Sequence, residues 1–93
     1  MDRVRDYIWI EADTPRDLRL RILREVAERH DLPSSLLLST TRRAEVIAAK
    51  REAMAAIRDR LGDSYPMIGR FFACDHTTIL FHIKKYREAA HAG

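Results

Sequence analysis

The apolar positions of the chain recur every three to four residues over most of its length, which predicts helices rather than strands. A first helix is expected from Thr14 to near His30. Its start has three matching features: Thr14 as N-cap, Pro15 in the first turn, and Asp17 as the reciprocal capping acid. The residues that would form its apolar face are Leu18, Ile22, Leu23, Val26 and Ala27.

The longest helix is expected from about Arg42 to Leu61, with candidate N-caps at residues 39–41 and Gly62 as a left-handed C-cap. A brief turn at residues 34–38 precedes it and carries three leucines that a small domain would bury. The inward positions of the long helix would be Val46, Ile47, Ala53, Met54, Ile57 and Leu61.

Two shorter helices follow, joined by a turn of only two or three residues. The first runs from Tyr65 to Phe72 with Ser64 as its cap, and the second from Asp75 to about Ala90. This layout is typical of a helix-turn-helix, whose second helix lies in the DNA major groove and contacts base edges with its N-terminal residues. The core-facing residues of the pair would be Ile68, Phe71, Phe72, Ile79, Leu80, Ile83 and Tyr86.

These elements predict an all-α fold, a small helical bundle of four main helices that contains the helix-turn-helix. Residues 14–93 would form this single domain, and residues 1–13 an N-terminal extension. The extension holds an apolar patch, too short to classify as helix or strand, at Tyr7, Ile8, Trp9 and Ile10.

Composition agrees with a compact helical protein. Of the 93 residues, 46% are hydrophobic and 33% charged, and the formal net charge is +3. Residues 1–41 hold seven basic and eight acidic side chains, whereas residues 42–93 hold ten and six, so the positive surplus accompanies the helix-turn-helix. The sequence contains no apolar run near 18 residues and no basic start followed by an apolar stretch. We therefore expect no membrane span and a cytoplasmic, nucleoid-associated protein.

The sequence lacks the residue combinations that several kinds of site require. The single Cys74 has no Cys-x-x-Cys or paired-His companion, which argues against a disulfide or zinc. Gly62, Gly69 and Gly93 cannot form a phosphate-binding loop ahead of a Lys-Ser or Lys-Thr pair, so no nucleotide is expected. No Ser-His-Asp grouping, carboxylate pair or metal set can be assembled, so we expect neither an enzyme nor a cofactor.

Short strings spread over residues 22–86 resemble one known family. They are Val26-Ala27-Glu28, Leu37-Leu38-Ser39, Arg42-Arg43, Ala53-Met54-Ala55, Ser64, Pro66, Ile68-Gly69, Phe72 and Asp75-His76-Thr77-Thr78. Together they are similar to the C-terminal DNA-binding domain (domain IV) of the bacterial replication initiator DnaA, a domain of Trp-repressor-like architecture. The resemblance covers about 65 of the 93 residues.

The resemblance implies base contacts by Asp75, His76, Thr77 and Thr78. Their chemistry suits that role, because the carboxylate accepts, the imidazole donates or accepts, and threonine adds a methyl group able to touch thymine. Arg42 corresponds to the family's arginine that enters the adjacent minor groove. The alternative is that Asp75 is only an N-cap and the other residues lie at ordinary helix starts. Cations at a helix N-terminus oppose its dipole, however, and require another cause.

Phosphate contacts are expected from cations and from the start of the first short helix, where free amides and the dipole suit an anion. Each cation could equally be a solvated surface residue. The expected set is Arg43, Lys50, Arg51, Ser64, Tyr65, Met67, Lys84 and Lys85, with Arg87 further along. His82 is expected to be a surface histidine.

The chain departs from the family in its turn. Residues 72–75 are one residue shorter than the family's turn and lack its glycines and arginine, so Ala73 or Cys74 must take a positive φ at a cost of roughly 1 kcal/mol. Ala44 and Ala48 replace basic residues, which lowers the expected affinity.

The resulting hypothesis is a sequence-specific, double-stranded DNA-binding protein of DnaA-box type. It would act in transcription or replication control without the ATPase module of the initiator. The alternative is a protein–protein adaptor that keeps the scaffold, has lost DNA binding, and contacts a protein partner through residues 7–10.

Overall fold

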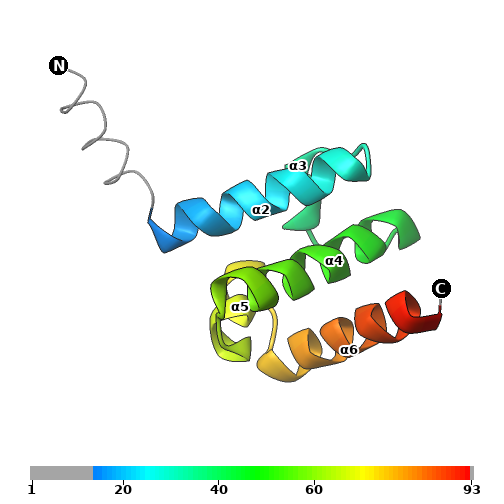
Figure 1. The fold of residues 1–93 in the computed structure, drawn as a ribbon. Coiled ribbons are helices and arrows are strands. Elements are labelled where there is room, and N and C mark those ends of the chain that lie inside the picture. The colour runs from blue at the N-terminus through cyan, green and yellow to red at the C-terminus, as the bar shows by residue number, and fades with distance from the viewer. Residues whose placement is uncertain (1–13, 93) are drawn as a thin grey trace, which may run out of the picture.

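The computed structural model describes residues 14–92, which form helices joined by short loops, with no strand in that range (Figure 1). The all-α prediction is confirmed. The predicted apolar patch at residues 7–10 lies outside the described residues. The helices are α2 (Pro15–Arg29), α3 (Ser34–Leu37), α4 (Ala44–Leu61), α5 (Tyr65–Phe72) and α6 (His76–Ala92).

Helix α2 begins as its sequence predicts. The Asp17 amide donates to Thr14 Oγ1 at 3.2 Å, and the Thr14 amide donates back to Asp17 Oδ2 at 3.2 Å. This reciprocal pair satisfies two N–H groups that the helix itself cannot. Hydrogen bonds from the Thr14 side chain and backbone also lower the pKa of Asp17, so its carboxylate stays ionised at the positive end of the helix dipole.

Helix α4 is the centre of the core. In Figure 1 it lies between α2 above it and α6 below it, and it also contacts α3 and α5. Alanines at its buried positions let the neighbouring helices approach closely. The buried apolar residues are Ile22, Leu23, Val26 and Ala27 of α2, Leu37 of α3, Val46, Ala49, Ala53, Met54, Ala55 and Ile57 of α4, Ile68 and Phe72 of α5, and Ile79 and Ile83 of α6.

A buried ion pair fixes the loop between α4 and α5. Arg19 Nε of α2 lies 2.5 Å from Asp63 Oδ2, and the two side chains are only 14% and 10% exposed. Arg58 donates to the Asp63 carbonyl at 2.8 Å, and its guanidinium lies 4.5 Å from the centre of the Tyr65 ring. These contacts set where α5 begins.

The turn between α5 and α6 is tight and relies on one glycine. Ala73 adopts the left-handed conformation (φ 57°, ψ 45°), which confirms the strained position predicted for residues 73–74. The Cys74 amide donates to the Gly69 carbonyl at 2.8 Å. A Cβ on Gly69 would lie 2.5 Å from the Cys74 carbonyl oxygen, so only glycine permits this close approach.

The start of α4 differs from the prediction. The helix begins at Ala44, two residues later than expected, and Arg43 is its N-cap without a side-chain capping bond. The hydroxyls proposed as caps act within the loop instead, because Ser39 Oγ accepts from the Thr41 amide and Thr41 Oγ1 from the Arg43 amide, each at 3.4 Å. Gly62 does end the helix in the left-handed conformation, as predicted.

The inward face predicted for the last helix is wrong at one position. Ile79 and Ile83 are buried, but Leu80 is 46% exposed. Successive helical residues turn by about 100°, so a side chain next to Ile79 is carried away from α4 and α5 whatever its polarity. Phe71 of α5, also placed in the core, is only partly buried and packs at its edge.

Candidate nucleic-acid interface

The four residues predicted to contact bases, 75–78, lie at the N-terminal end of α6 with exposed side chains. The Asp75 carboxylate accepts a hydrogen bond from the Thr77 hydroxyl, which lowers the pKa of Asp75. Asp75 Oδ1 also lies 3.5 Å from His76 Nδ1. Asp75 therefore organises the start of the helix, while the His76 Nε2 and the Thr78 hydroxyl have no partner in the described part of the chain.

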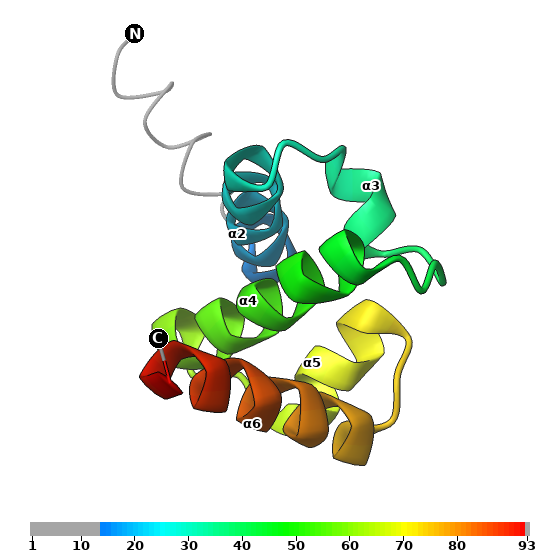
Figure 2. The ribbon, with the colours of Figure 1, turned by 90° about the vertical axis from the view of Figure 1, so that its right-hand side faces the viewer.

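Arg42 lies in the exposed loop between α3 and α4 and makes no ion pair with any residue in the range 14–92. Its neighbour Arg43 is engaged locally, because two of its nitrogens contact Glu45 Oε2 at 2.5 and 3.1 Å. In Figure 2 the loop that carries Arg42 and the turn that precedes α6 both lie along the right-hand edge of the molecule. The loop with the exposed Arg42 and the segment with the exposed residues 75–78 thus lie on the same side of the fold.

Lys50 and Arg51, predicted to contact phosphates, are half-buried on α4. Lys50 Nζ donates to the Ser39 carbonyl at 2.5 Å, which ties α4 to the preceding loop. Arg51 Nε donates to His82 Nδ1 at 3.1 Å, which ties α4 to α6. Both cations therefore have structural partners within the protein, and His82 is half-buried rather than a surface residue.

The start of α5 offers fewer free amides than the sequence suggested. Ser64 caps the helix as predicted, since its Oγ accepts from the Met67 amide at 3.3 Å and its carbonyl accepts from Ile68 at 3.0 Å. Pro66 has no N–H to offer. Met67 is therefore not available as an amide donor to phosphate, although its side chain is 39% exposed. The Tyr65 amide remains.

The cations further along α6 differ in their pairing. Arg87 is 2.9 Å from Asp59 Oδ1 of α4, and Lys85 lies 4.0 Å from Glu88. Lys84 is exposed and has no ion pair within residues 14–92. Of the two lysines predicted to contact phosphate on this helix, Lys84 is the one whose charge no carboxylate of the described chain offsets.

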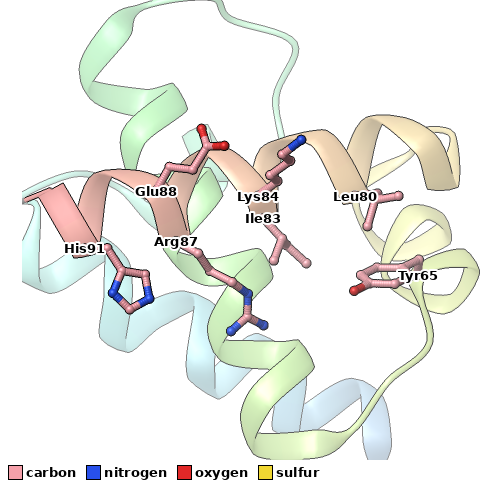
Figure 3. Close-up of a pocket in the computed structure, with 7 residues that line it drawn as sticks. All are labelled: Tyr65, Leu80, Ile83, Lys84, Arg87, Glu88 and His91. Atoms are coloured by element: carbon pink, nitrogen blue, oxygen red, sulfur yellow. The ribbon is translucent and has the colours of Figure 1, made fainter.

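An open groove of about 800 Å³ runs along one flank of α6 (Figure 3). Leu80 and Ile83 of α6 and the Tyr65 ring of α5 form its apolar end, and Arg87 extends across it toward α4. Residues 75–78, which are predicted to contact bases, do not line this groove. Its remaining lining residues are Lys84, Glu88 and His91.

One exposed residue of α6 was missed in the sequence. Phe81 is 50% exposed, and it follows Thr77 and Thr78 by four and three residues. That spacing places it on the same helical face as the two threonines. The spacing was visible in the sequence, but an aromatic residue in an amphipathic helix is more often part of the core, and only the packing shows that this one is not.

Comparison with known proteins assigns this chain to a family. A family model described as the bacterial DnaA protein helix-turn-helix matches residues 20–85. The chain belongs to this family. The match spans three complete helices, α3 to α5, and most of α2 and α6, so it covers the packed domain and its helix-turn-helix.

Three relatives, each a chromosomal replication initiator protein DnaA, illustrate the similarity. The protein of Deinococcus deserti is 36% identical over 67 residues, which cover 72% of this chain and 15% of the relative. That of Thermus thermophilus is 38% identical over 80 residues (82% and 18%), and that of Nitrobacter hamburgensis 37% over 84 residues (88% and 17%). The chain thus spans less than a fifth of the length of these relatives. No solved structure matches it significantly.

No three His, Cys, Asp or Glu side chains gather within residues 14–92 as metal ligands would. No helix in that range combines the length and the apolar character needed to cross a membrane. The described surface is distinguished instead by its exposed polar residues and cations at the N-terminal ends of α4 and α6.

Proposed function

We propose that this chain is a sequence-specific, double-stranded DNA-binding domain of DnaA-box type that acts in replication or transcription control. Residues 14–93 form the domain and residues 1–13 an extension. The N-terminal end of α6 enters the major groove, and Arg42 enters the adjacent minor groove. Two observations carry the proposal. Residues 75–78 and Arg42 are exposed, and the segments that hold them, the start of α6 and the loop before α4, lie on the same side of a DnaA-family helix-turn-helix (Figure 2).

The chemistry of the exposed groups supports base recognition. His76 and Thr78 offer hydrogen-bonding atoms without a partner in the described chain, and the threonine methyl groups can touch thymine. Asp75 is ionised and can accept from the amino group of cytosine or adenine, while it would repel a phosphate. This combination suits base edges better than the DNA backbone.

Phosphate contacts come from groups around this centre. Arg42 and Lys84 carry charges that no described carboxylate offsets, and Arg43 and Lys85 hold their charges in exposed, weak pairs. Phosphates can compete for such surface partners. The half-buried Lys50 and Arg51 add positive potential behind them while keeping their structural bonds.

A salt series with duplex DNA tests the proposal. If about five phosphates are neutralised, the logarithm of the association constant should fall against the logarithm of salt concentration with a slope of about −4 to −5. Competition by random-sequence duplex should be weaker than competition by the site selected from a random pool. A flat salt dependence, or equal binding to every duplex, would contradict the proposal.

A second candidate is a protein–protein contact through the apolar end of the groove, which the exposure of Leu80 favours. Chemical-shift perturbation by duplex DNA separates the two candidates. For a DNA-binding domain the shifts cluster at residues 42–43 and 75–78. For an adaptor that has lost DNA binding, the shifts are absent or spread evenly over the molecule.

A further inference from the structure

We propose that Phe81 contacts the 5-methyl group of a thymine in the major groove and thereby contributes to sequence specificity. The inference rests on the proposed function, since it requires that α6 enters the groove. It assigns a base-contacting role to a residue beyond the four at the start of the helix.

The position of Phe81 on α6 is the first argument. The buried face of the helix is set by Ile79 and Ile83, which are 0% and 2% exposed. Phe81 lies one turn beyond Thr77 and Thr78 on the opposite face and is half exposed. A helix that places these threonines against bases therefore carries the phenyl ring along the same groove, about one helical turn (roughly 5 Å) further toward the C-terminal end of α6.

Three neighbours hold the ring, which is the second argument. The Arg51 guanidinium carbon lies 5.9 Å from the ring centre and Lys85 Nζ lies 5.6 Å from it. The His82 ring is 5.7 Å away, centre to centre, in an edge-to-face arrangement at 63°. A phenyl ring with two cations and an aromatic neighbour loses less freedom on binding than an isolated exposed one.

The hydrogen bond between Arg51 and His82 keeps this cluster in place. His82 Nδ1 accepts from Arg51 Nε at 3.1 Å, which requires that this nitrogen carries no proton. Burial, reinforced by the charges of Arg51 and Lys50, lowers the pKa of His82 and so maintains the neutral ring. The terminal nitrogens of Arg51 have no hydrogen-bond partner in the described part of the chain, so they remain available to an anion.

The chemistry of the cluster matches DNA. Its two cations favour a polyanion, whereas the ring itself needs an apolar contact. In the major groove the apolar group that a natural base presents is the thymine methyl, and phenylalanine is among the side chains that contact it. An acidic protein with an apolar patch is the competing partner, and the experiment below distinguishes it.

Removal of single methyl groups from DNA tests the inference. A site selected from random duplexes is resynthesised with each thymine replaced in turn by deoxyuridine, which lacks only the methyl. At one or two positions the wild-type chain should lose about fourfold in affinity, the value of one buried methyl group. Phe81→Ala should bind the thymine and uracil duplexes equally at those positions. Leu80→Ala, an exposed apolar control on the other flank, should keep the difference.

The outcomes are separable. Failure of the wild-type chain to bind any duplex would overturn the proposed function and this inference together. Duplex binding without a position at which Phe81→Ala abolishes the methyl effect would overturn the inference alone. Thermal unfolding of Phe81→Ala checks that it is folded, and Phe81→Leu, which keeps an apolar side chain, should retain part of the methyl effect if the ring is the contact.

Discussion

The N-terminal ends of α2 and α4 differ in their capping and in the pairing of their charged side chains. At α2, Thr14 and Asp17 cap the helix reciprocally, and Arg19 is neutralised by Asp63. At α4, the N-cap is Arg43 without a capping bond, and Arg42 before it has no ion pair in residues 14–92. The charge of Arg19 on α2 is therefore paired within the protein. The charge of Arg42, by contrast, is exposed to solvent at the positive end of the α4 dipole.

The N-terminal end of α4 therefore lowers the free energy of unfolding. A missing N-cap side chain costs about 1 kcal/mol, and a cation at the N-terminal end of the helix adds about 0.3–1 kcal/mol. The buried face of α4, with Val46 and Ile57 fully inaccessible, offsets it. Proteins that break such local rules tend to do so at functional sites, and an external anion such as a phosphate would relieve both penalties.

The largest effect is expected in the region where charges are paired internally. Asp63→Asn leaves the Arg19 guanidinium without its partner in a site where the Arg19 side chain is only 14% exposed. We expect the free energy of unfolding to fall by about 3 kcal/mol, measured by urea denaturation. The control Glu25→Gln removes the exposed partner of Arg60 and should cost no more than about 0.5 kcal/mol. Equal losses in the two variants would show that Asp63 is solvated after all.

Arg42→Ala tests the N-terminal end of α4, where the charges are not paired within the protein. It should weaken duplex binding about 30-fold, because it removes a minor-groove contact of about 2 kcal/mol. The free energy of unfolding should change by no more than about 0.5 kcal/mol, since the side chain has no partner within the described chain. Titration of a labelled duplex measures the affinity. The control is Arg24→Ala, an exposed cation on α2, and an equal loss for both variants would mean that only total charge matters.

The parts that the sequence predicted correctly are those fixed by residues close together. The cap at Thr14, the end of α4 at Gly62 and the left-handed residue expected at 73 or 74 each depend on interactions within a few residues. The all-α bundle likewise follows from the apolar period, which requires every helix to bury one face.

The parts that it did not predict depend on contacts between elements. The pairing of Arg51 with His82, 31 residues apart, decides that this cation is half-buried. The exposure of Leu80 and Phe81 depends on which face of α6 packs against α4 and α5, because both residues are as apolar as their buried neighbours. Composition and spacing alone do not determine that face.

A substitution at the N-cap of α4 should separate stability from binding. Arg43→Ser supplies the missing capping oxygen and removes a cation, so the free energy of unfolding should rise by about 1 kcal/mol. Duplex affinity should fall about threefold, the loss of one exposed phosphate contact. Urea denaturation and duplex titration on the same variant measure both.

The reverse change at α2 is the control for this experiment. Thr14→Ala should lower the free energy of unfolding by about 1 kcal/mol and leave duplex affinity unchanged. A stabilised Arg43→Ser that binds DNA as well as the wild-type chain would remove the reason for an arginine at the start of α4.

The smallest effect is expected at the turn before α6, where another local rule is broken. Ala73→Gly relieves the left-handed strain of about 1 kcal/mol, but it also loosens the unfolded chain, so a net gain of about 0.5 kcal/mol is expected. Gly62→Ala is the matched opposite, since Gly62 has φ 70° and nothing lies within 4 Å of an added Cβ. It should cost about 1 kcal/mol through backbone strain alone. If urea denaturation shows Ala73→Gly to be destabilising, contacts of the Ala73 methyl stabilise the fold by more than its left-handed backbone conformation costs. The conformation of Ala73 would then not be a net cost to stability.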